Sequence, residues 1–97
     1  MDEIKFSWDG RKAEQNIKKH KVSFEESATV FYDANAIEFF DPDHSKDEDR
    51  FLMLGLSWRL RILVVCCCLR KKGSEIRIVS ARKTTKEEDK VYTGEKR

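Results

Sequence analysis

Apolar and polar side chains alternate along several short segments of the chain, which is the pattern of strands with one buried face. The first such segment is Ile4-Lys5-Phe6-Ser7-Trp8, where Ile4, Phe6 and Trp8 share one side. The same reasoning predicts further strands over residues 36–40, 50–57, 60–70 and 75–82. Because the segment 60–70 is apolar on both sides, we expect it to be a central strand, covered on both faces.

Two helices are predicted between the first two strands. Asp9 can accept hydrogen bonds from the free amides of a first helical turn, so a helix is expected over residues 11–20. Ser23 and Glu26 have the spacing of a capping box, in which each residue bonds the backbone of the other. A second helix should therefore follow Ser23 and end near residues 33–35.

The order of elements predicts an α+β fold. A last helix should begin after Thr84 or Thr85, so the order is strand, helix, helix, four strands and helix. The four later strands are expected to form a mostly antiparallel meander, with the N-terminal strand and the first helices packed on one face. A chain of 97 residues forms one domain, spanning residues 1–97. The other sheet face is then open, and we expect the functional side chains there.

The charges are unevenly divided along the chain. Residues 1–49 carry seven Lys and Arg against thirteen Asp and Glu, whereas residues 50–97 carry thirteen against five. A basic half-surface is expected of a protein that binds a polyanion such as RNA. Two ordinary solvated surfaces of different charge would give the same counts.

The three cysteines form one run, Cys66-Cys67-Cys68. Neighbouring side chains in a strand point to opposite faces, so the run suits neither a disulfide framework nor a zinc site. We interpret them as reduced, buried residues, and therefore expect a cytoplasmic protein. No apolar stretch reaches the roughly 18 residues of a membrane span, and no metal or glycine-rich phosphate motif is found. Neither a membrane location nor a cofactor is expected.

Metal-independent cleavage of RNA requires a base, an acid and positive charge beside the phosphate. Arg50 and Arg82 are the candidates for the charge, because they lie on strands that flank the central one and could approach a common phosphate if the register allows. His44, in the polar segment 41–49, is the best candidate for acid–base chemistry, and Glu48 is the next. Each could equally be an ordinary polar loop residue.

Further basic residues are candidates for contacts with an RNA backbone. They are Arg61, Lys71, Lys72, Lys83 and Lys86. Strict alternation along the last strand would place Arg77, Val79 and Ala81 on one face, with Ile76, Ile78, Ser80 and Arg82 on the other. His20 is expected to be a helix-end residue with a structural role.

The ordered motifs resemble the BrnT family of ribonuclease toxins. Its first half is represented by Phe6-Ser7-Trp8-Asp9 and by the segment from Asn16 to Glu26. The second half is represented by His44-Ser45-x-x-Glu48-x-Arg50 and by Arg77-Ile78-Val79-Ser80-Ala81-Arg82-Lys83, followed by Glu87-Glu88 and Tyr92. The chain departs from the family at Lys21, where a glycine is usual.

The resemblance implies a RelE-like fold and a toxin that cleaves RNA and thereby inhibits translation. It also implies a partner, a BrnA-like antitoxin that neutralises the toxin and binds operator DNA, so that contact with DNA is indirect. The matching motifs contain His44, Glu48, Arg50 and Arg82, and we carry over only these as catalytic candidates. The alternative is a non-catalytic toxin-like module that holds a DNA-binding partner.

Overall fold

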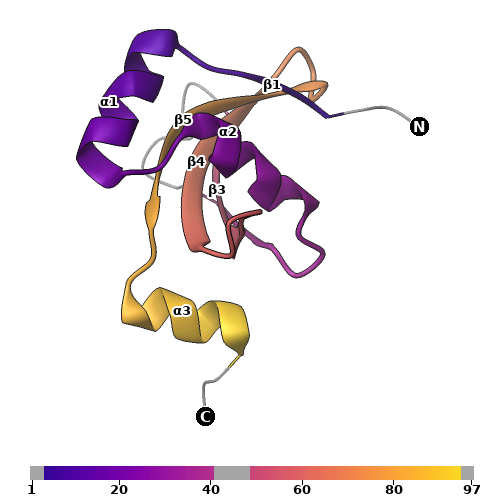
Figure 1. Cartoon of the computed structure of the whole chain (residues 1–97). Coiled ribbons are helices and arrows are strands. Elements are labelled where there is room, and N and C mark those ends of the chain that lie inside the picture. The colour runs from indigo at the N-terminus through magenta and orange to yellow at the C-terminus, as the bar shows by residue number, and fades with distance from the viewer. Residues whose placement is uncertain (1–3, 41–48, 95–97) are drawn as a thin grey trace.

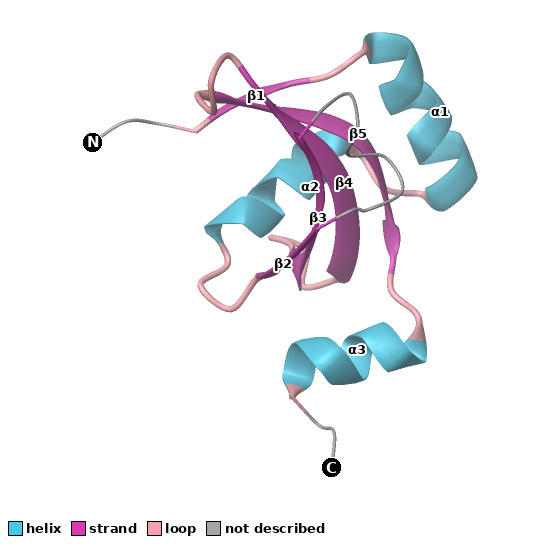
Figure 2. Cartoon of the chain, turned by 180° about the vertical axis from the view of Figure 1, so that it is seen from behind, coloured by secondary structure: helices cyan, strands magenta, loops and turns pink. Residues whose placement is uncertain are grey.

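The structure, a computed structural model, describes residues 4–40 and 49–94 (Figure 1). In chain order the elements are β1 (Lys5–Ser7), α1 (Gly10–His20), α2 (Phe24–Thr29), a 3-10 helix η1 (Val30–Tyr32), β2 (Ile37–Phe40), β3 (Asp49–Leu56), β4 (Ile62–Arg70), β5 (Glu75–Lys83) and α3 (Lys86–Thr93). The predicted α+β class and order of elements are confirmed. Seen from behind, α2 lies across the sheet from the viewer, α1 lies beside β5, and α3 lies beyond one end of the sheet (Figure 2).

The five strands form one sheet in the order β1-β5-β4-β3-β2. Strand β1 runs parallel to β5, and the remaining neighbours are antiparallel, as the meander predicts. β4 is central, in agreement with its apolar sequence. The side chains of Leu63, Val65 and Cys67 alternate along β4 toward the helices and are completely buried. We call this side of the sheet the helix face and the opposite side the open face.

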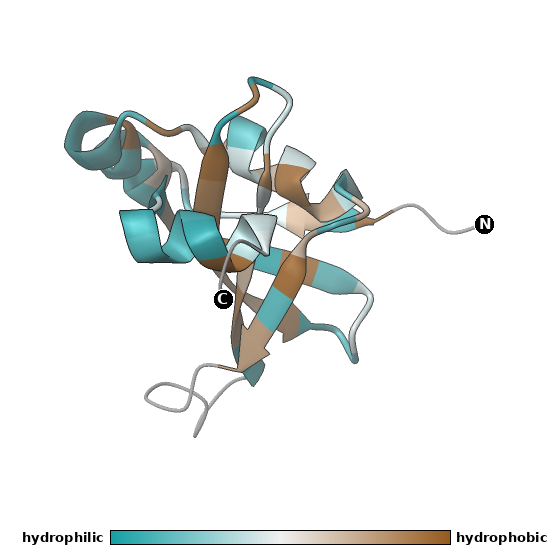
Figure 3. Ribbon diagram, turned by 90° about the horizontal axis from the view of Figure 1, so that it is seen from below, coloured by the Kyte–Doolittle hydropathy of each residue, from teal (hydrophilic) through white to brown (hydrophobic). Residues whose placement is uncertain are grey.

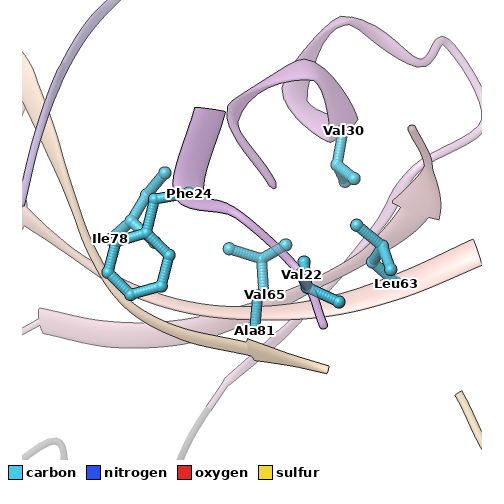
Figure 4. Close-up of a cluster of buried hydrophobic side chains, with 7 residues drawn as sticks. All are labelled: Val22, Phe24, Val30, Leu63, Val65, Ile78 and Ala81. Atoms are coloured by element: carbon cyan, nitrogen blue, oxygen red, sulfur yellow. The ribbon is translucent and has the colours of Figure 1, made fainter. Parts of the chain in front are cut away.

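The core lies between the helix face and the helical segment above it (Figure 4). Val22, Phe24 and Val30 come from the helical segment, and they pack against Leu63 and Val65 of the sheet. Complete burial of such a side chain stabilises the fold by about 1.5–3 kcal/mol. The hydropathy colouring shows apolar strands and a mostly hydrophilic α3 (Figure 3). The core is therefore formed by the sheet, α2 and η1, and α3 contributes no buried residue.

Side-chain caps begin the helices where the sequence predicts. Asp9 accepts hydrogen bonds from the amides of Arg11 and Lys12, at 2.8 and 3.2 Å. Ser23 accepts from the amide of Glu26, at 3.0 Å. The Glu26 carboxylate does not complete the predicted capping box, because it is bound to the guanidinium of Arg61 instead. That expectation was wrong in its second half.

The last helix does have a complete capping box. Thr85 accepts a hydrogen bond from the amide of Glu88, and the Glu88 side chain accepts one from the amide of Thr85. Thr85 is therefore the cap, which resolves the choice between Thr84 and Thr85. The hydroxyl of Thr84 bonds Asp89 in the same turn.

A β-bulge at Val79 changes the faces of β5. Cys67 pairs with Ile78, but the next position, Cys66, pairs with Ser80. Val79 of β5 therefore has no paired residue on β4. A bulge of this kind reverses the alternation beyond it. Ile78 and Ala81 consequently both face the core, at 1% and 2% exposure. The predicted grouping of these side chains was wrong because strict alternation takes no account of a bulge.

Candidate functional site

The bulge brings Arg77, Ser80 and Arg82 onto the open face together. Arg77 pairs with Cys68, Ser80 with Cys66, and Arg82 with Val64. These three β4 residues alternate with Leu63, Val65 and Cys67, which face the helices. Polar and charged side chains of β5 thus line the side of the sheet that α1 and α2 leave uncovered. This is where the sequence predicts the functional residues.

One end of the open face carries a pocket of about 150 Å³ that is rich in cations. We call it the cationic pocket, and its lining consists of Asp9, Lys12, Arg50, Cys68, Arg70, Arg77, Ile78 and Val79. Arg50 on β3 and Arg77 on β5 both pair with Cys68, so they flank it from either side. With neighbouring strands ~4.8 Å apart, their Cα atoms are about 10 Å apart, a span that two arginine side chains can close around one anion.

Among the described residues, a single carboxylate lines the cationic pocket, and it is already engaged. Asp9 caps α1, and the amides of Lys12 and Arg11 that it accepts from lower its pKa. It therefore remains ionised and bound to the helix end at neutral pH. The pocket thus places three guanidinium groups and an ammonium group around one engaged carboxylate, an arrangement suited to binding phosphate.

Arg82 lies too far along the sheet to share a phosphate with Arg50. Strands β3 and β5 run in the same direction, so the start of β3 and the end of β5 lie at opposite ends of the sheet. The β4 partners of the two arginines, Cys68 and Val64, are four residues apart, about 13 Å at ~3.3 Å per residue. The expected approach of Arg50 and Arg82 is therefore corrected, and Arg77 takes the place beside Arg50.

The guanidinium of Arg82 is bound to α3. Two of its nitrogens donate to the two carboxylate oxygens of Glu88, each at 2.9 Å. This pairing raises the pKa of Arg82 and lowers that of Glu88 to about 2. Both groups therefore stay charged across the physiological range, and the ion pair attaches α3 to the end of β5.

Arg61 is held in the fold by a buried partner. Its guanidinium donates to both carboxylate oxygens of Glu26, at 2.9 and 2.5 Å, and to the carbonyl of Lys21 at 3.0 Å. Glu26 is only 2% exposed and also accepts from the hydroxyl of Ser57, at 2.7 Å. Arg61 therefore fixes the β3–β4 turn against α2, and its expected contact with RNA remains a prediction.

The remaining basic candidates lie near the two ends of β5. Lys71 and Lys72 are exposed in the β4–β5 turn, directly after Arg70, and Lys71 forms an ion pair with Glu75 at 3.3 Å. Lys83 and Lys86 are exposed beyond Arg82, at the junction with α3. His44 and Glu48 lie outside the described residues, so their expected roles remain predictions.

The sequence-based reasoning missed a second pocket of about 130 Å³ at the middle of the open face. We call it the central pocket, and its lining consists of His20, Leu52, Val64, Cys66, Ser80, Ala81 and Arg82. His20 reaches it from the C-terminal end of α1. The signal that could have located it is the four-residue spacing of Lys12, Asn16 and His20, which places them along one side of the helix.

A third pocket of about 330 Å³ lies between the open face and α3. Phe39, Leu52, Leu54 and Val64 form its sheet side, and Glu88 and Val91 form its α3 side. Leu52 and Val64 also line the central pocket, so the two pockets adjoin. The open face therefore changes from cationic at one end to apolar at the other.

Two kinds of feature are absent from the described part of the chain. Across residues 4–40 and 49–94, no three His, Cys, Asp or Glu side chains gather as a metal-binding group. Over the same ranges, no helix is both long and apolar enough to cross a membrane.

Comparison with known proteins gives two matches of interest and one negative result. Residues 8–88 match the family model described as "Ribonuclease toxin, BrnT, of type II toxin-antitoxin system". The fold is similar to the crystal structure of the Brucella abortus ribonuclease toxin BrnT, with 22% sequence identity and a TM-score of 0.65. That match covers 87% of this chain and 100% of the other. No curated protein matches the sequence.

Proposed function

The chain belongs to the BrnT family of ribonuclease toxins of type II toxin–antitoxin systems, and from this premise we propose that it is a metal-independent endoribonuclease. The observation that supports the proposal best is the placement of Arg50 and Arg77 on either side of Cys68, on the open face. Arg70 and Lys12 line the same pocket and add to its positive charge. The substrate group it suits is the phosphodiester of RNA.

The proposed reaction is an internal attack within the RNA chain. A base removes the proton of a ribose 2′-hydroxyl, and O2′ forms a bond to the adjacent phosphorus while the bond from phosphorus to O5′ breaks. An acid returns a proton to O5′, so the products carry a 2′,3′-cyclic phosphate and a 5′-hydroxyl. Arg50 and Arg77 stabilise the additional negative charge that the phosphorus oxygens acquire in the transition state.

His44 and Glu48, which lie outside the described residues, are proposed to contribute to proton transfer. We propose that exposed lysines near the two ends of β5 contact the RNA backbone on either side of the open face. They are Lys71, Lys72, Lys83 and Lys86. Contacts of this kind contribute affinity that falls with salt concentration and carries no sequence preference.

The family description names a toxin–antitoxin system, which supports the proposal of a protein inhibitor. We propose that a BrnA-like antitoxin neutralises this chain in the cytoplasm, and that operator DNA is bound only through that antitoxin. Cleavage of RNA by the free toxin would inhibit translation. Expression of the chain alone should then stop growth, and coexpression of the antitoxin should restore it.

The alternative, a non-catalytic module that holds a DNA-binding partner, is favoured by one observation. The guanidinium of Arg82, a catalytic candidate of the sequence motifs, is bound through two of its nitrogens by Glu88. A module of this kind would retain the fold and the basic pocket but would not cleave RNA, and its expression at high level would be harmless.

The two functions are separated by incubating the purified protein with RNA in the presence of EDTA. We expect cleavage products that carry 2′,3′-cyclic phosphates. Arg77→Gln should reduce the cleavage rate by on the order of 10²-fold, the usual effect of removing one group that stabilises the transition state. The matched control is Arg59→Gln, because Arg59 is an exposed arginine of the β3–β4 turn, outside the proposed site.

Two results would contradict the proposal. One is full activity of a folded Arg50→Gln/Arg77→Gln double variant. This result would show that the two arginines do not form the phosphate site. The other is cleavage that stops in EDTA and returns with added Mg²⁺. This result would contradict the metal-independent mechanism. Absence of cleavage under every condition, together with harmless expression, would support the binding module.

A further inference from the structure

We infer that His20 is a catalytic residue of this site and accepts the proton of the attacking 2′-hydroxyl. The inference rests on the proposed ribonuclease function and assigns its base. It follows from the way α1 is attached to the edge of β5, from the contents of the central pocket and from the engagement of the other bases that line the open face.

α1 takes the place of a neighbouring strand along the second half of β5. Strand β1 pairs with β5 only at residues 75–77. Further along, the side-chain amide of Asn16 bonds the backbone of Ala81 in both directions. Its Nδ2 donates to the carbonyl of Ala81 at 3.0 Å, and its Oδ1 accepts from the amide of Ala81 at 3.1 Å. The same Nδ2 donates to the carbonyl of Val22 at 2.8 Å.

This attachment determines where His20 lies. Asn16 is 6% exposed, and His20 follows it by four residues, so both lie on the same side of α1. The helix ends at His20, because Lys21 adopts a left-handed conformation (φ 61°) and its amide bonds the carbonyl of Ile17. His20 is thus half-buried at a fixed helix end beside Ser80 and Arg82, and lines the central pocket with them.

The central pocket adjoins the proposed phosphate site. Ser80 pairs with Cys66 and Arg77 with Cys68, so the two pairs follow one another on the open face, about 7 Å apart at ~3.3 Å per residue. A nucleotide whose phosphate lies between Arg50 and Arg77 therefore extends over the central pocket. His20 lines that pocket, so a ribose placed there would lie beside its side chain.

The two described carboxylates that line the pockets of this face are poor bases. Asp9 has a lowered pKa, and its Oδ1 accepts hydrogen bonds from the amides of Arg11 and Lys12 at the start of α1. Glu88 has a pKa of about 2 and is bound by Arg82. Among the described residues that line these pockets, His20 is the one histidine, the residue type that most often serves as a general base.

The groups that face His20 come from three elements and its own helix. Arg82 of β5 and the thiol of Cys66 of β4 line the central pocket, and Glu88 of α3 adjoins it through the Arg82 ion pair. Lys19 and Lys21 are its exposed neighbours in the chain. Within the described residues, the imidazole has no hydrogen bond or ion pair that would give it a structural role.

In the proposed step, a nitrogen of the neutral imidazole takes the proton of the 2′-hydroxyl as O2′ bonds to phosphorus. The imidazole becomes an imidazolium, and O5′ leaves with a proton from the acid. The imidazolium returns its proton to water after the cyclic product departs. General base catalysis of this kind contributes on the order of 10²–10⁴-fold to the rate.

The test measures the pH dependence of RNA cleavage in EDTA for the wild-type protein, His20→Gln and His20→Ala. We expect kcat to fall by on the order of 10²-fold or more in both variants, with little change in KM. The rise of kcat with pH on the acidic side of the profile should disappear. Added imidazole should restore part of the activity of His20→Ala, an effect that a purely structural role would not produce. Lys18→Gln, an exposed substitution on the same helix, is the control.

The outcomes separate this inference from the proposed function. A wild-type protein that does not cleave RNA would end both. If the wild-type protein cleaves but folded His20→Gln keeps its kcat, only the assignment of His20 fails. A raised KM without a change in kcat, or loss of the alkaline side of the profile, would likewise overturn its role as the base.

Discussion

The hydroxyl of Tyr92 donates a hydrogen bond to Oδ2 of Asp33, at 2.5 Å, and so connects α3 to the segment that precedes β2. The same Asp33 oxygen accepts the amide of Leu56, at 2.8 Å. At the other end of α3, Glu88 binds Arg82. Since α3 has no buried residue, these polar contacts at its two ends contribute to holding it in place.

Tyr92→Phe should therefore weaken the attachment of α3. We expect the free energy of unfolding to fall by about 0.5–1.5 kcal/mol, the usual contribution of one hydrogen bond. Amide hydrogen exchange should accelerate within Lys86–Thr93 more than in β4. Urea unfolding and exchange measured by mass spectrometry would test this. Tyr32→Phe is the control, because Tyr32 is 66% exposed. Equal effects of the two substitutions would contradict the prediction.

The stability of the fold should decrease in acid. Hydrogen bonds from Arg61 lower the pKa of Glu26, and those from Arg82 lower that of Glu88 to about 2. A carboxyl with a lowered pKa in the folded state stabilises that state at pH values above the carboxyl's ordinary pKa, which is 4.5 for Glu. This stabilisation is lost as the pH falls through the folded value. The free energy of unfolding should thus decline between about pH 4.5 and pH 2.

Glu88→Gln provides the matched comparison for this acid dependence. The variant should be less stable at neutral pH, and its stability should change less between about pH 4.5 and pH 2, because one of the two carboxyls is absent. Urea titrations at a series of pH values give the free energies. Parallel curves for the wild-type and variant proteins would show that Glu88 makes no such contribution.

Gly55 should not tolerate a larger side chain. A Cβ atom at this position would lie 2.7 Å from Cγ1 of Val30 and 3.1 Å from Cβ of Ala36. Gly55→Ala is expected to destabilise the fold by about 1–3 kcal/mol through overpacking. Gly10→Ala is the control, since an added Cβ meets nothing within 4 Å and alanine favours the helix. Thermal unfolding that ranks the two variants in the opposite order would refute the argument.

The three adjacent thiols should differ in reactivity. Burial raises the pKa of Cys67, and Cys67 and Cys68 are 0% and 1% exposed, whereas Cys66 is half-buried. Because the thiolate is the reactive form, we expect a thiol reagent to modify Cys66 first in the folded protein. All three should react in denaturant. Intact mass measured over time would show one rapid adduct, and three adducts formed at equal rates would contradict the burial pattern.

The hydrophobic pattern predicted the elements of this fold well because most of them are decided locally. The segment 60–70 is apolar on both faces and is indeed the central strand, and Asp9 and Ser23 begin helices as expected. Glu26 shows the limit of local reasoning. Its spacing from Ser23 suits a capping box, but a guanidinium 35 residues away binds the carboxylate more strongly than a backbone amide does.

The candidate site was less predictable because it depends on contacts between distant segments. A single bulged residue, Val79, decides that Arg77 and Arg82 share a face, and the direction of the strands places Arg82 away from Arg50. His20 looked like an ordinary helix end, since its position depends on a bond between Asn16 and Ala81 across 65 residues. The family resemblance located the basic strands but not the register between them.

The amide of Asn16 has one more consequence, which concerns association between molecules. Strand β1 ends at Ser7, opposite Arg77, so the rest of β5 would present an unpaired strand edge. Another chain can add a strand to such an edge and start aggregation. Asn16 occupies both hydrogen-bonding groups of Ala81 and keeps α1 against that edge. A side chain that holds the helix in place thereby also protects the sheet from edge-to-edge stacking on this side.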